Sequence, residues 1–284
     1  MKVPISLICC THNGAKKIPK LINSIFKNDY QPKEIIICGT NMNDVKNLNQ
    51  KKNIKFLLSP VANQVYQRNL AIKKSKYELI IQCDDDIILE KSFIKKMHNH
   101  FKDNIYEKKI VSASIYTKNN LHQSIRWNDL YNNNNIFRFL MNFLNGFKEV
   151  NYMSILGSGR IAPRLPFEYL KYNKRKKKVL ENNEWLCSTI CYNKKYYSRD
   201  ISLKNYKKSF FEDVIFTHKL FKKKFNLILD PNIVAYHPYK EPSSFVLFLK
   251  TLPVQFHIVK KFDKSFFLFI LDVIMLSSLY LLNK

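Results

Sequence analysis

Glycine is scarce in this sequence, and two familiar phosphate-binding loops are missing. Only 5 of the 284 residues are glycine, and neither a G-x-G-x-x-G string nor a G-x-x-x-x-G-K-[ST] string occurs. Both strings work by wrapping backbone amides around phosphate groups. Their absence argues against a dinucleotide-binding loop and a P-loop. It also argues against a nucleotidyltransferase, which needs a glycine-rich, basic loop after its first strand.

Acidic residues are also few. The chain has 48 lysines and arginines against 22 aspartates and glutamates, which gives a formal charge of +26. Such an excess favours a polyanionic partner: nucleic acid, an anionic membrane leaflet or a phosphorylated substrate. No aromatic-interleaved RNA motif and no zinc-finger spacing supports nucleic acid, so we expect no nucleic-acid partner. The alternative is a solvated basic surface.

Cysteines are present but lack a pairing pattern. Four of the six lie in apolar, strand-like runs, and Cys187 and Cys191 stand four apart without a second pair. This usage predicts reduced, buried thiols in a cytosolic protein rather than a disulfide framework or a zinc site. Residues 1–4 lead directly into an apolar run, so we expect no signal peptide.

The chain does have enough apolar sequence for a core. Hydrophobic residues make up 46% of it and aromatic residues 14%, which suits one large α/β domain with or without an appendage. Apolar, strand-like runs alternate with segments that have helical periodicity. This order predicts a Rossmann-like, mostly parallel sheet with helices on both faces. The predicted strands are Val3–Cys10, Glu34–Cys38, Ile54–Leu58, Leu79–Cys83 and Ile110–Tyr116, and the predicted helices are Lys16–Asn28, Ala62–Ser75 and Ser92–Phe101.

The rest of the chain is less regular. Residues 119–151 are rich in asparagine. The elements predicted beyond residue 117 are a short amphipathic helix at Ile136–Phe147, a strand at Glu184–Tyr192, a helix at Glu212–Lys224 and short strands at Leu227–Leu229 and Ile233–Tyr236. From Pro242 the composition becomes apolar. We therefore expect a main domain at residues 1–240 and a C-terminal helical, membrane-associated segment at residues 241–284.

The C-terminal segment contains an 18-residue, strongly apolar stretch, Ser265–Leu282, with lysines on both sides. That length is at the short end for a membrane span, and Asp272 near its centre would cost about 2.5–3.5 kcal/mol there. A helix lying in the membrane interface fits as well as a span; the alternative is a core or dimer helix. Flanking basic residues add about 1 kcal/mol each against an anionic leaflet, so we expect attachment to the cytoplasmic face of a membrane.

Three consecutive aspartates, Asp84, Asp85 and Asp86, follow the predicted strand Leu79–Cys83. Adjacent like charges are tolerated where a cation or solvent neutralises them, and open α/β sheets bind ligands at the carboxyl ends of their strands. Alternation along an extended strand predicts Asp84 and Asp86 on one side, with Asp85 facing away. Two carboxylates on one side suit Mg²⁺ or Mn²⁺. The alternative is a polar loop or a helix N-terminus.

The aspartate triplet resembles the D-x-D motif of family 2 glycosyltransferases, which have the GT-A fold. Other segments resemble that family in the same order: its first strand and T-x-N turn, the next helix and strand, the R-N element before the D-x-D strand, and the E-D motif. These segments are Ile5–Asn13, Ser24–Phe26, Pro32–Ile37, Gln67–Ala71 and Phe211–Asp213. Each motif alone is weak, but their order and spacing across residues 3–240 make a specific signal.

The resemblance implies a role for each candidate site residue. Asp213 is the expected catalytic base, Glu212 and Trp185 are expected at the acceptor, and Asp86 with His237 is expected to hold Mn²⁺ or Mg²⁺. The expected nucleotide-sugar-binding residues are Thr11, Asn13, Thr40, Arg68, Asn69, Asp84 and Asp85. Structural alternatives stay open, namely helix capping for Thr11, Asn13, Glu212 and Asp213, a surface position for Arg68 and His237, and core packing for Trp185.

The chain departs from the family at the end of the second strand. The family usually has acidic residues there that contact the nucleotide base, whereas this chain reads Cys38-Gly39-Thr40-Asn41. Thr40 or Asn41 can hydrogen-bond a base edge or ribose, but the usual carboxylate is missing at this place. Residues 117–180 are expected to shape the acceptor pocket.

The sequence therefore predicts a metal-dependent, inverting glycosyltransferase of the hexosyltransferase type. A metal at Asp86 would neutralise charge growing on the pyrophosphate, Arg68 would add a second cation, and Asp213 would take the proton of an acceptor hydroxyl. We expect a nucleotide-sugar donor and a saccharide or lipid-linked acceptor in surface polysaccharide or glycolipid synthesis. The rival hypotheses are a non-catalytic sugar-nucleotide- or membrane-binding module and a nucleic-acid binder.

Overall fold

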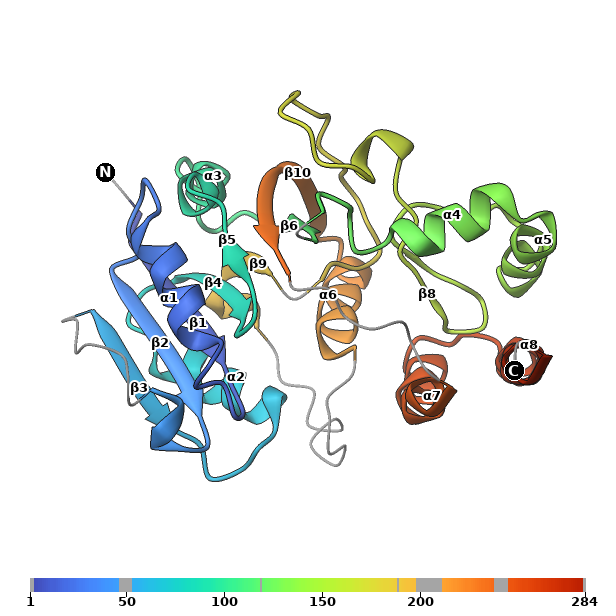
Figure 1. Ribbon diagram of the computed structural model, residues 1–284, viewed down its shortest axis with the longest axis horizontal. Coiled ribbons are helices and arrows are strands. Elements are labelled where there is room, and N and C mark those ends of the chain that lie inside the picture. The colour runs from blue at the N-terminus through green and yellow to red at the C-terminus, as the bar shows by residue number, and fades with distance from the viewer. Residues whose placement is uncertain are drawn as a thin grey trace. The chain divides into compact units, whose positions relative to one another are not determined.

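The protein is described by a computed structural model at residues 3–45, 53–117, 119–187, 189–197, 211–237 and 245–282. The chain divides into two compact units (Figure 1). Unit 1 comprises residues 1–120 and 173–238, and unit 2 comprises residues 121–172 and 239–284. The domain boundary expected at residues 240 and 241 lies outside the described residues.

Unit 1 contains a mixed, mostly parallel sheet of eight strands in the order β3-β2-β1-β4-β9-β6-β10-β5. Strand β1 is parallel to β2 and β4, β2 to β3, and β6 to β10, whereas β9 and β5 are antiparallel to their neighbours. The strands are β1 (Ile5–Cys10), β2 (Glu34–Gly39), β3 (Ile54–Leu58), β4 (Leu79–Asp84), β5 (Ile88–Leu89), β6 (Lys109–Tyr116), β9 (Ile190–Asn193) and β10 (Asn226–Tyr236). The predicted fold class is confirmed.

Helices cover both faces of this sheet. All residues of β1 are buried, which requires packing on each side of the strand. Ile5, Leu7 and Cys9 join a core cluster with residues of α1 (Ile18–Phe26) and α3 (Phe93–Asn99). Helix α2 (Gln64–Lys74) contacts β1 and β2 without entering that cluster, so it covers the opposite face. The remaining helices of unit 1 are α6 (Glu212–Lys222) and the short 3₁₀ helices η1 (Met42–Asp44) and η3 (Lys194–Tyr196).

Three predicted strands differ from the structure. Among the described residues of the predicted strand Glu184–Tyr192, only Ile190–Tyr192 is in a strand, β9. The backbone near residue 185 bonds to helix α6 instead, where Leu186 N donates to Thr217 Oγ1 at 3.0 Å. The predicted pair Leu227–Leu229 and Ile233–Tyr236 is one strand, β10, whose register shifts between Asp230 and Val234. Pro231 lies in this interval, and a proline has no N–H to donate to a ladder.

Unit 2 consists of helices and one two-stranded ribbon. Its core gathers Tyr131, Met141 and Leu144, with Met275 packed against them. Its elements are α4 (Ile125–Asn133), α5 (Asn135–Leu144), β7 (Ser154–Ile155), β8 (Ile161–Ala162), η2 (Phe167–Tyr169), α7 (Phe245–Lys261) and α8 (Phe266–Leu282). In the described part of the chain, no helix combines the length and the apolarity needed to cross a membrane.

All six cysteine thiols are free, and five of them are buried. Four of the buried thiols, at residues 9, 10, 38 and 83, lie in β1, β2 and β4. They behave as small apolar side chains of the sheet.

Candidate active site

The carboxyl ends of β1 and β4 place Thr11 beside the aspartate triplet. The two strands are parallel, and Cys10 is in register with Asp84, so the residues that follow each strand meet at one edge of the sheet. Thr11 Oγ1 donates to Asp85 Oδ2 at 2.7 Å. A Cβ on Gly14 would lie 1.8 Å from that threonine oxygen, so glycine leaves the space that this hydrogen bond occupies.

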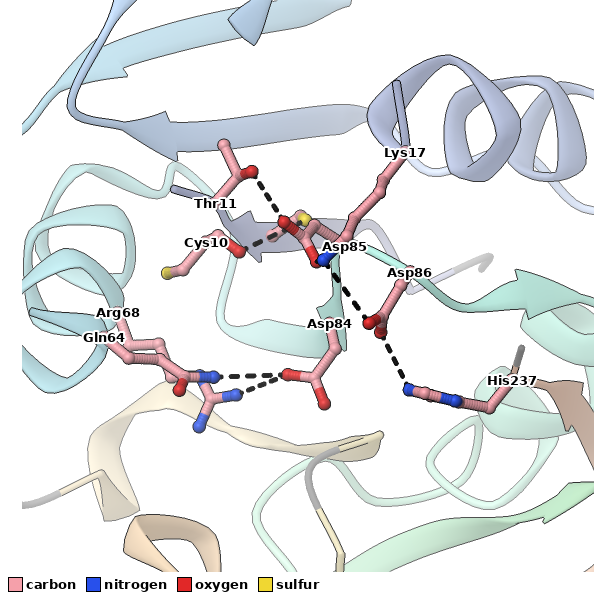
Figure 2. A network of polar contacts seen from close by, with 10 residues as sticks. Cys10, Thr11, Lys17, Gln64, Arg68, Asp84, Asp85, Asp86 and His237 are labelled. Carbon is pink, nitrogen blue, oxygen red and sulfur yellow. Dashed lines mark hydrogen bonds and ion pairs between the residues drawn. The ribbon is translucent and has the colours of Figure 1, made fainter. Parts of the chain in front are cut away.

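The three aspartates point in different directions (Figure 2). Asp84 accepts from Arg68 at 2.8 Å, Asp85 faces Thr11 and Lys17, and Asp86 Oδ1 lies 3.0 Å from Nε2 of His237. The expectation that Asp84 and Asp86 share a side, with Asp85 facing away, is wrong. Strand β4 ends at Asp84, and Asp85 and Asp86 lie in the turn that follows, so the alternation of an extended strand does not continue through them.

Lys17 is a site residue that the sequence did not reveal. Its ammonium lies 3.2 Å from Asp85 Oδ1 and 3.5 Å from Asp86 Oδ2. Burial lowers the pKa of Lys17, but the carboxylates of Asp85 and Asp86 outweigh this and raise it overall. The lysine therefore stays charged and offsets part of the triplet's repulsion. Nothing in the sequence separates it from the other lysines that flank the helix after β1.

Arg68 is buried and joins two acidic residues. Its guanidinium bonds to Asp84 at 2.8 Å and also pairs with Glu212 at the start of α6. Burial lowers the pKa of Arg68, but Asp84 and further neighbours such as Asp213 together raise it overall, so the cation is retained. The surface position considered as an alternative is wrong, because the side chain is 3% exposed. Arg68 thus ties α2 to both β4 and α6.

Asp213 follows Glu212 in the first turn of α6. Burial, opposed by Arg68 and reinforced by Asp84, raises the pKa of Asp213 from its ordinary 3.8 to about 6. A carboxylate with this pKa is ionised at neutral pH and binds a proton more readily than an exposed one. Asp213 therefore suits a general base, although acidic residues also favour the first turn of a helix for electrostatic reasons.

His237 reaches the aspartates from the end of β10. Its backbone N–H donates to Tyr116 O at 2.8 Å, which continues the β10–β6 pairing and fixes where the side chain begins. Among the residues that the structure describes, no three His, Cys, Asp or Glu side chains form a ready-made metal site. Asp86 and His237 nevertheless offer an oxygen and a nitrogen 3.0 Å apart. Adjacent ligands of an octahedral ion bound at about 2.1 Å are about 3 Å apart, so the pair fits two ligand positions of one ion.

The end of β2 holds a buried carboxylate that the sequence analysis missed. Thr40 Oγ1 lies 3.0 Å from Nδ1 of His12, and Asn13 is exposed with φ 58°. Asp44, in η1, is 4% exposed, and its Oδ2 has no hydrogen-bond partner among the described residues. That oxygen is 3.3 Å from the place where a Cβ on Gly39 would lie. An aspartate a few residues after a strand end is the signal that could have identified it.

Two predicted site residues, Asn69 and Trp185, are buried. The side-chain amide of Asn69 donates to Val65 O at 2.9 Å, within helix α2. Trp185 is 7% exposed, so little of its indole face is open for a sugar ring. Burial therefore favours the core-packing alternative for Trp185.

Comparisons with known proteins identify the family and the fold of the chain. A family model described as glycosyl transferase family 2 matches residues 6–162. Among solved structures, S. aureus TarS is 16% identical to this chain, with a TM-score of 0.52. The match covers 89% of this chain and 39% of the TarS chain. GalNAc-T7 with UDP, GalNAc and Mn²⁺ is 13% identical with a TM-score of 0.62, covering 91% of this chain and 48% of that one.

A shorter TarS fragment, residues 1–349 in complex with UDP-GlcNAc, is 15% identical with a TM-score of 0.53. This comparison covers 89% of the present chain and 65% of the fragment. The chain thus spans less than two thirds of these structures, and at such identities the likeness establishes the fold alone. No curated protein matches the sequence.

Proposed function

Because the chain belongs to glycosyl transferase family 2, we propose that it transfers a sugar from a nucleotide-sugar donor to an acceptor hydroxyl. The observation that carries the proposal is the approach of His237 to Asp86 at the carboxyl end of β4. Ligands of open α/β sheets bind at this edge. The UDP-GlcNAc and the UDP with GalNAc in two solved neighbours favour a UDP-linked hexose derivative as the donor.

Asp86 and His237 would hold a divalent cation, and Mn²⁺ accompanies UDP in the GalNAc-T7 structure. When bound, such an ion supplies positive charge that stabilises the leaving diphosphate. Lys17 already contacts Asp85 and Asp86, so its ammonium adds a second positive charge at the same place. Arg68 acts less directly, since its buried guanidinium holds Asp84 and Glu212 in position.

Asp213 would act as the general base. It takes the proton of the acceptor hydroxyl as the oxygen forms a bond to the anomeric carbon and the bond to the diphosphate oxygen breaks. The nucleoside diphosphate leaves with the bonding electrons. One displacement of this kind inverts the anomeric centre, so the product should have the anomeric configuration opposite to that of the donor. A product with retained configuration, observed by NMR, would rule this mechanism out.

The remaining polar residues divide between donor and acceptor. The predicted residues Thr11, Asn13 and Thr40 gather near the ends of β1 and β2 with Asp44, which the sequence did not predict. This position favours a role at the nucleoside. Glu212 would help to position the acceptor beside Asp213. We place the reaction in surface polysaccharide or glycolipid synthesis at the cytoplasmic face of a membrane, since the +26 charge suits an anionic surface.

The proposal is tested by measuring nucleotide-sugar binding by calorimetry, with UDP-GlcNAc and UDP-hexoses, in Mn²⁺ and in a chelator. We expect binding of at least one donor in Mn²⁺ that weakens about tenfold or more in the chelator and in Asp86→Asn, because the diphosphate then loses its counter-charge.

The matched control is Asp103→Asn, which makes the same change at an exposed position of unit 1. It should bind like the wild type. Equal donor binding by wild type and Asp86→Asn in Mn²⁺ would remove Asp86 from the site. Failure to bind any donor would count against the function itself.

A further inference from the structure

Helix α8 has its polar and apolar sides reversed relative to an ordinary surface helix. Phe267, Ile270 and Ile274 are 68%, 40% and 56% exposed. They follow the i, i+3, i+7 spacing of a single helical face, and we call these three residues the α8 stripe. The one charged residue of the helix, Asp272, is 0% exposed. In water, a helix normally buries its apolar face and exposes its charges.

The orientation of α8 is fixed by a buried ion pair within unit 2. Arg160 Nε lies 2.9 Å from each carboxylate oxygen of Asp272, and Gln255 Nε2 donates to Asp272 Oδ2 at 2.7 Å. Turning the stripe inward would carry Asp272 into the solvent and break all three contacts. The charged network therefore holds the apolar residues outside.

Exposed apolar side chains are concentrated in unit 2. All five of the exposed phenylalanines among the described residues belong to it, namely Phe139, Phe147, Phe167, Phe266 and Phe267. Helix α5 contacts α8 and exposes Ile136 and Phe139, at 71% and 61%. Exposed apolar groups gathered on neighbouring elements mark a surface that docks on something. We assign that surface to the contacting helices α5 and α8; Phe167, in η2, is not part of it.

The charge of the chain favours a lipid bilayer, rather than a second copy of the chain, as the partner that covers this apolar surface. Two copies, each carrying +26, repel one another, whereas an anionic bilayer attracts them. Lys260, exposed at the end of α7, supplies a cation close to the start of α8. Phenylalanine and isoleucine on one face, with basic residues nearby, are typical of helices that lie in the membrane interface.

We propose that the α8 stripe docks unit 2 on an anionic lipid bilayer, with α8 lying in the plane of the interface. Asp272 then stays paired with Arg160 inside the protein, while the α8 stripe enters the boundary between the lipid headgroups and the acyl chains. The docking surface is independent of sugar transfer, and its test requires no donor or acceptor.

The test is co-sedimentation of the full chain with vesicles of phosphatidylcholine alone and of phosphatidylcholine with phosphatidylglycerol. We expect binding to the anionic vesicles that Phe267→Ser and Ile270→Ser each weaken by about tenfold, because each removes a large apolar side chain from the lipid contact. Both residues are exposed, so thermal unfolding should be unchanged. Ile274→Ser provides a third variant should either of the first two unfold.

The matched control is Phe167→Ser, which removes a more exposed phenylalanine (82%) of the same unit at a position outside the stripe. It should bind like the wild type. Unchanged binding by the stripe variants, or equal loss in Phe167→Ser, would overturn the proposal. A wild type that ignores vesicles but sediments as a dimer, and a Phe267→Ser variant that is monomeric, would assign the stripe to a second copy.

Discussion

Asp213 is the residue whose ionisation should set the pH dependence of catalysis. Its pKa is raised to about 6 by burial, with Asp84 adding to the effect against Arg68. A protonated carboxyl cannot accept the hydroxyl proton, so kcat/KM should fall about tenfold for each pH unit below about 6. Asp213→Asn should lower the rate by about 10²–10⁴-fold and abolish this limb of the pH profile. If the kcat/KM of Asp213→Asn still falls below pH 6 as the wild type's does, another group is responsible for that pH dependence.

The same ionisation has a consequence for stability. A carboxyl whose pKa is higher in the folded chain than in the unfolded chain binds its proton more tightly when folded. Its contribution to stability is therefore lost as the pH rises from 3.8 through about 6. Asp213→Asn removes the cost of the buried charge. The rise of the pKa from 3.8 to about 6 corresponds to about 3 kcal/mol, so the Tm of the variant should exceed the wild-type Tm by about 6–12 °C at pH 8. The difference should vanish at pH 4 in thermal unfolding followed by circular dichroism.

Asp44 is the residue most suited to replace the missing acid of the second strand. Its Oδ2 is buried without a hydrogen-bond partner among the described residues, and such an oxygen gains a hydrogen bond when a donor group such as a base N–H arrives. We expect Asp44→Asn to weaken UDP binding about tenfold in calorimetry without lowering the Tm. Asp103→Asn again serves as the control. Unchanged UDP affinity would leave Asp44 a structural residue.

Several site residues could be predicted from the sequence, and others could not. The aspartate triplet and the Glu212-Asp213 pair are recognisable because carboxylates directly follow a strand or open a helix. Lys17 acts through contacts with Asp85 and Asp86, about 70 residues away in the sequence, that only folding creates. Several lysines lie nearby in the sequence, so no pattern marks Lys17. Asp44 follows the end of β2 by a few residues, which is a weak signal, and its burial exists only in the folded chain.

At the scale of whole elements, the stable placement of helix α8 in unit 2 depends on the ion pair between Arg160 and Asp272. Removing one partner of a buried ion pair leaves the other uncompensated, which typically costs about 3–5 kcal/mol. Arg160, the partner left behind, is 21% exposed and keeps some contact with water, so Asp272→Ala should destabilise unit 2 by about 1–3 kcal/mol. Urea unfolding can be followed by the fluorescence of Trp127, which stacks on Tyr131 in the same unit.

The double substitution Arg160→Met with Asp272→Leu is the informative control for this ion pair. Replacing both partners with apolar side chains removes the uncompensated charge, so much of the lost stability should return. A double variant no more stable than Asp272→Ala would mean that packing, not charge, holds α8 in place.

The elements that were predicted well are those with a clear local sequence pattern. Strands β1 to β4 alternate with helices, so apolar runs and helical periodicity identify them. Strand β9 inserts between β4 and β6 from far along the chain, and its length is set by contacts with α6 that local sequence does not encode. Helix α4 was missed because it lies in an asparagine-rich stretch, and asparagine is typical of turns and loops.

For the molecule as a whole, the charge of +26 predicts adhesion to polyanions without sequence recognition. Affinity for duplex DNA should fall by about 10³-fold or more between 50 and 200 mM salt if six or more phosphates are contacted. The α8 stripe variant Phe267→Ser should leave this affinity unchanged. Filter binding at several salt concentrations checks both statements. DNA binding that resists salt and prefers one sequence would instead support a nucleic-acid function.

The contact of Lys17 with Asp85 and Asp86 bears on whether the protein can fold before it binds a metal. An acidic cluster that has its own cation does not need a metal to fold, so the chain can complete its structure during synthesis without waiting for a metal supply. In the proposed metal-dependent reaction, the ion would then bind after folding is complete. A shortage of that metal would leave a folded but inactive protein, which would regain activity when the metal is supplied.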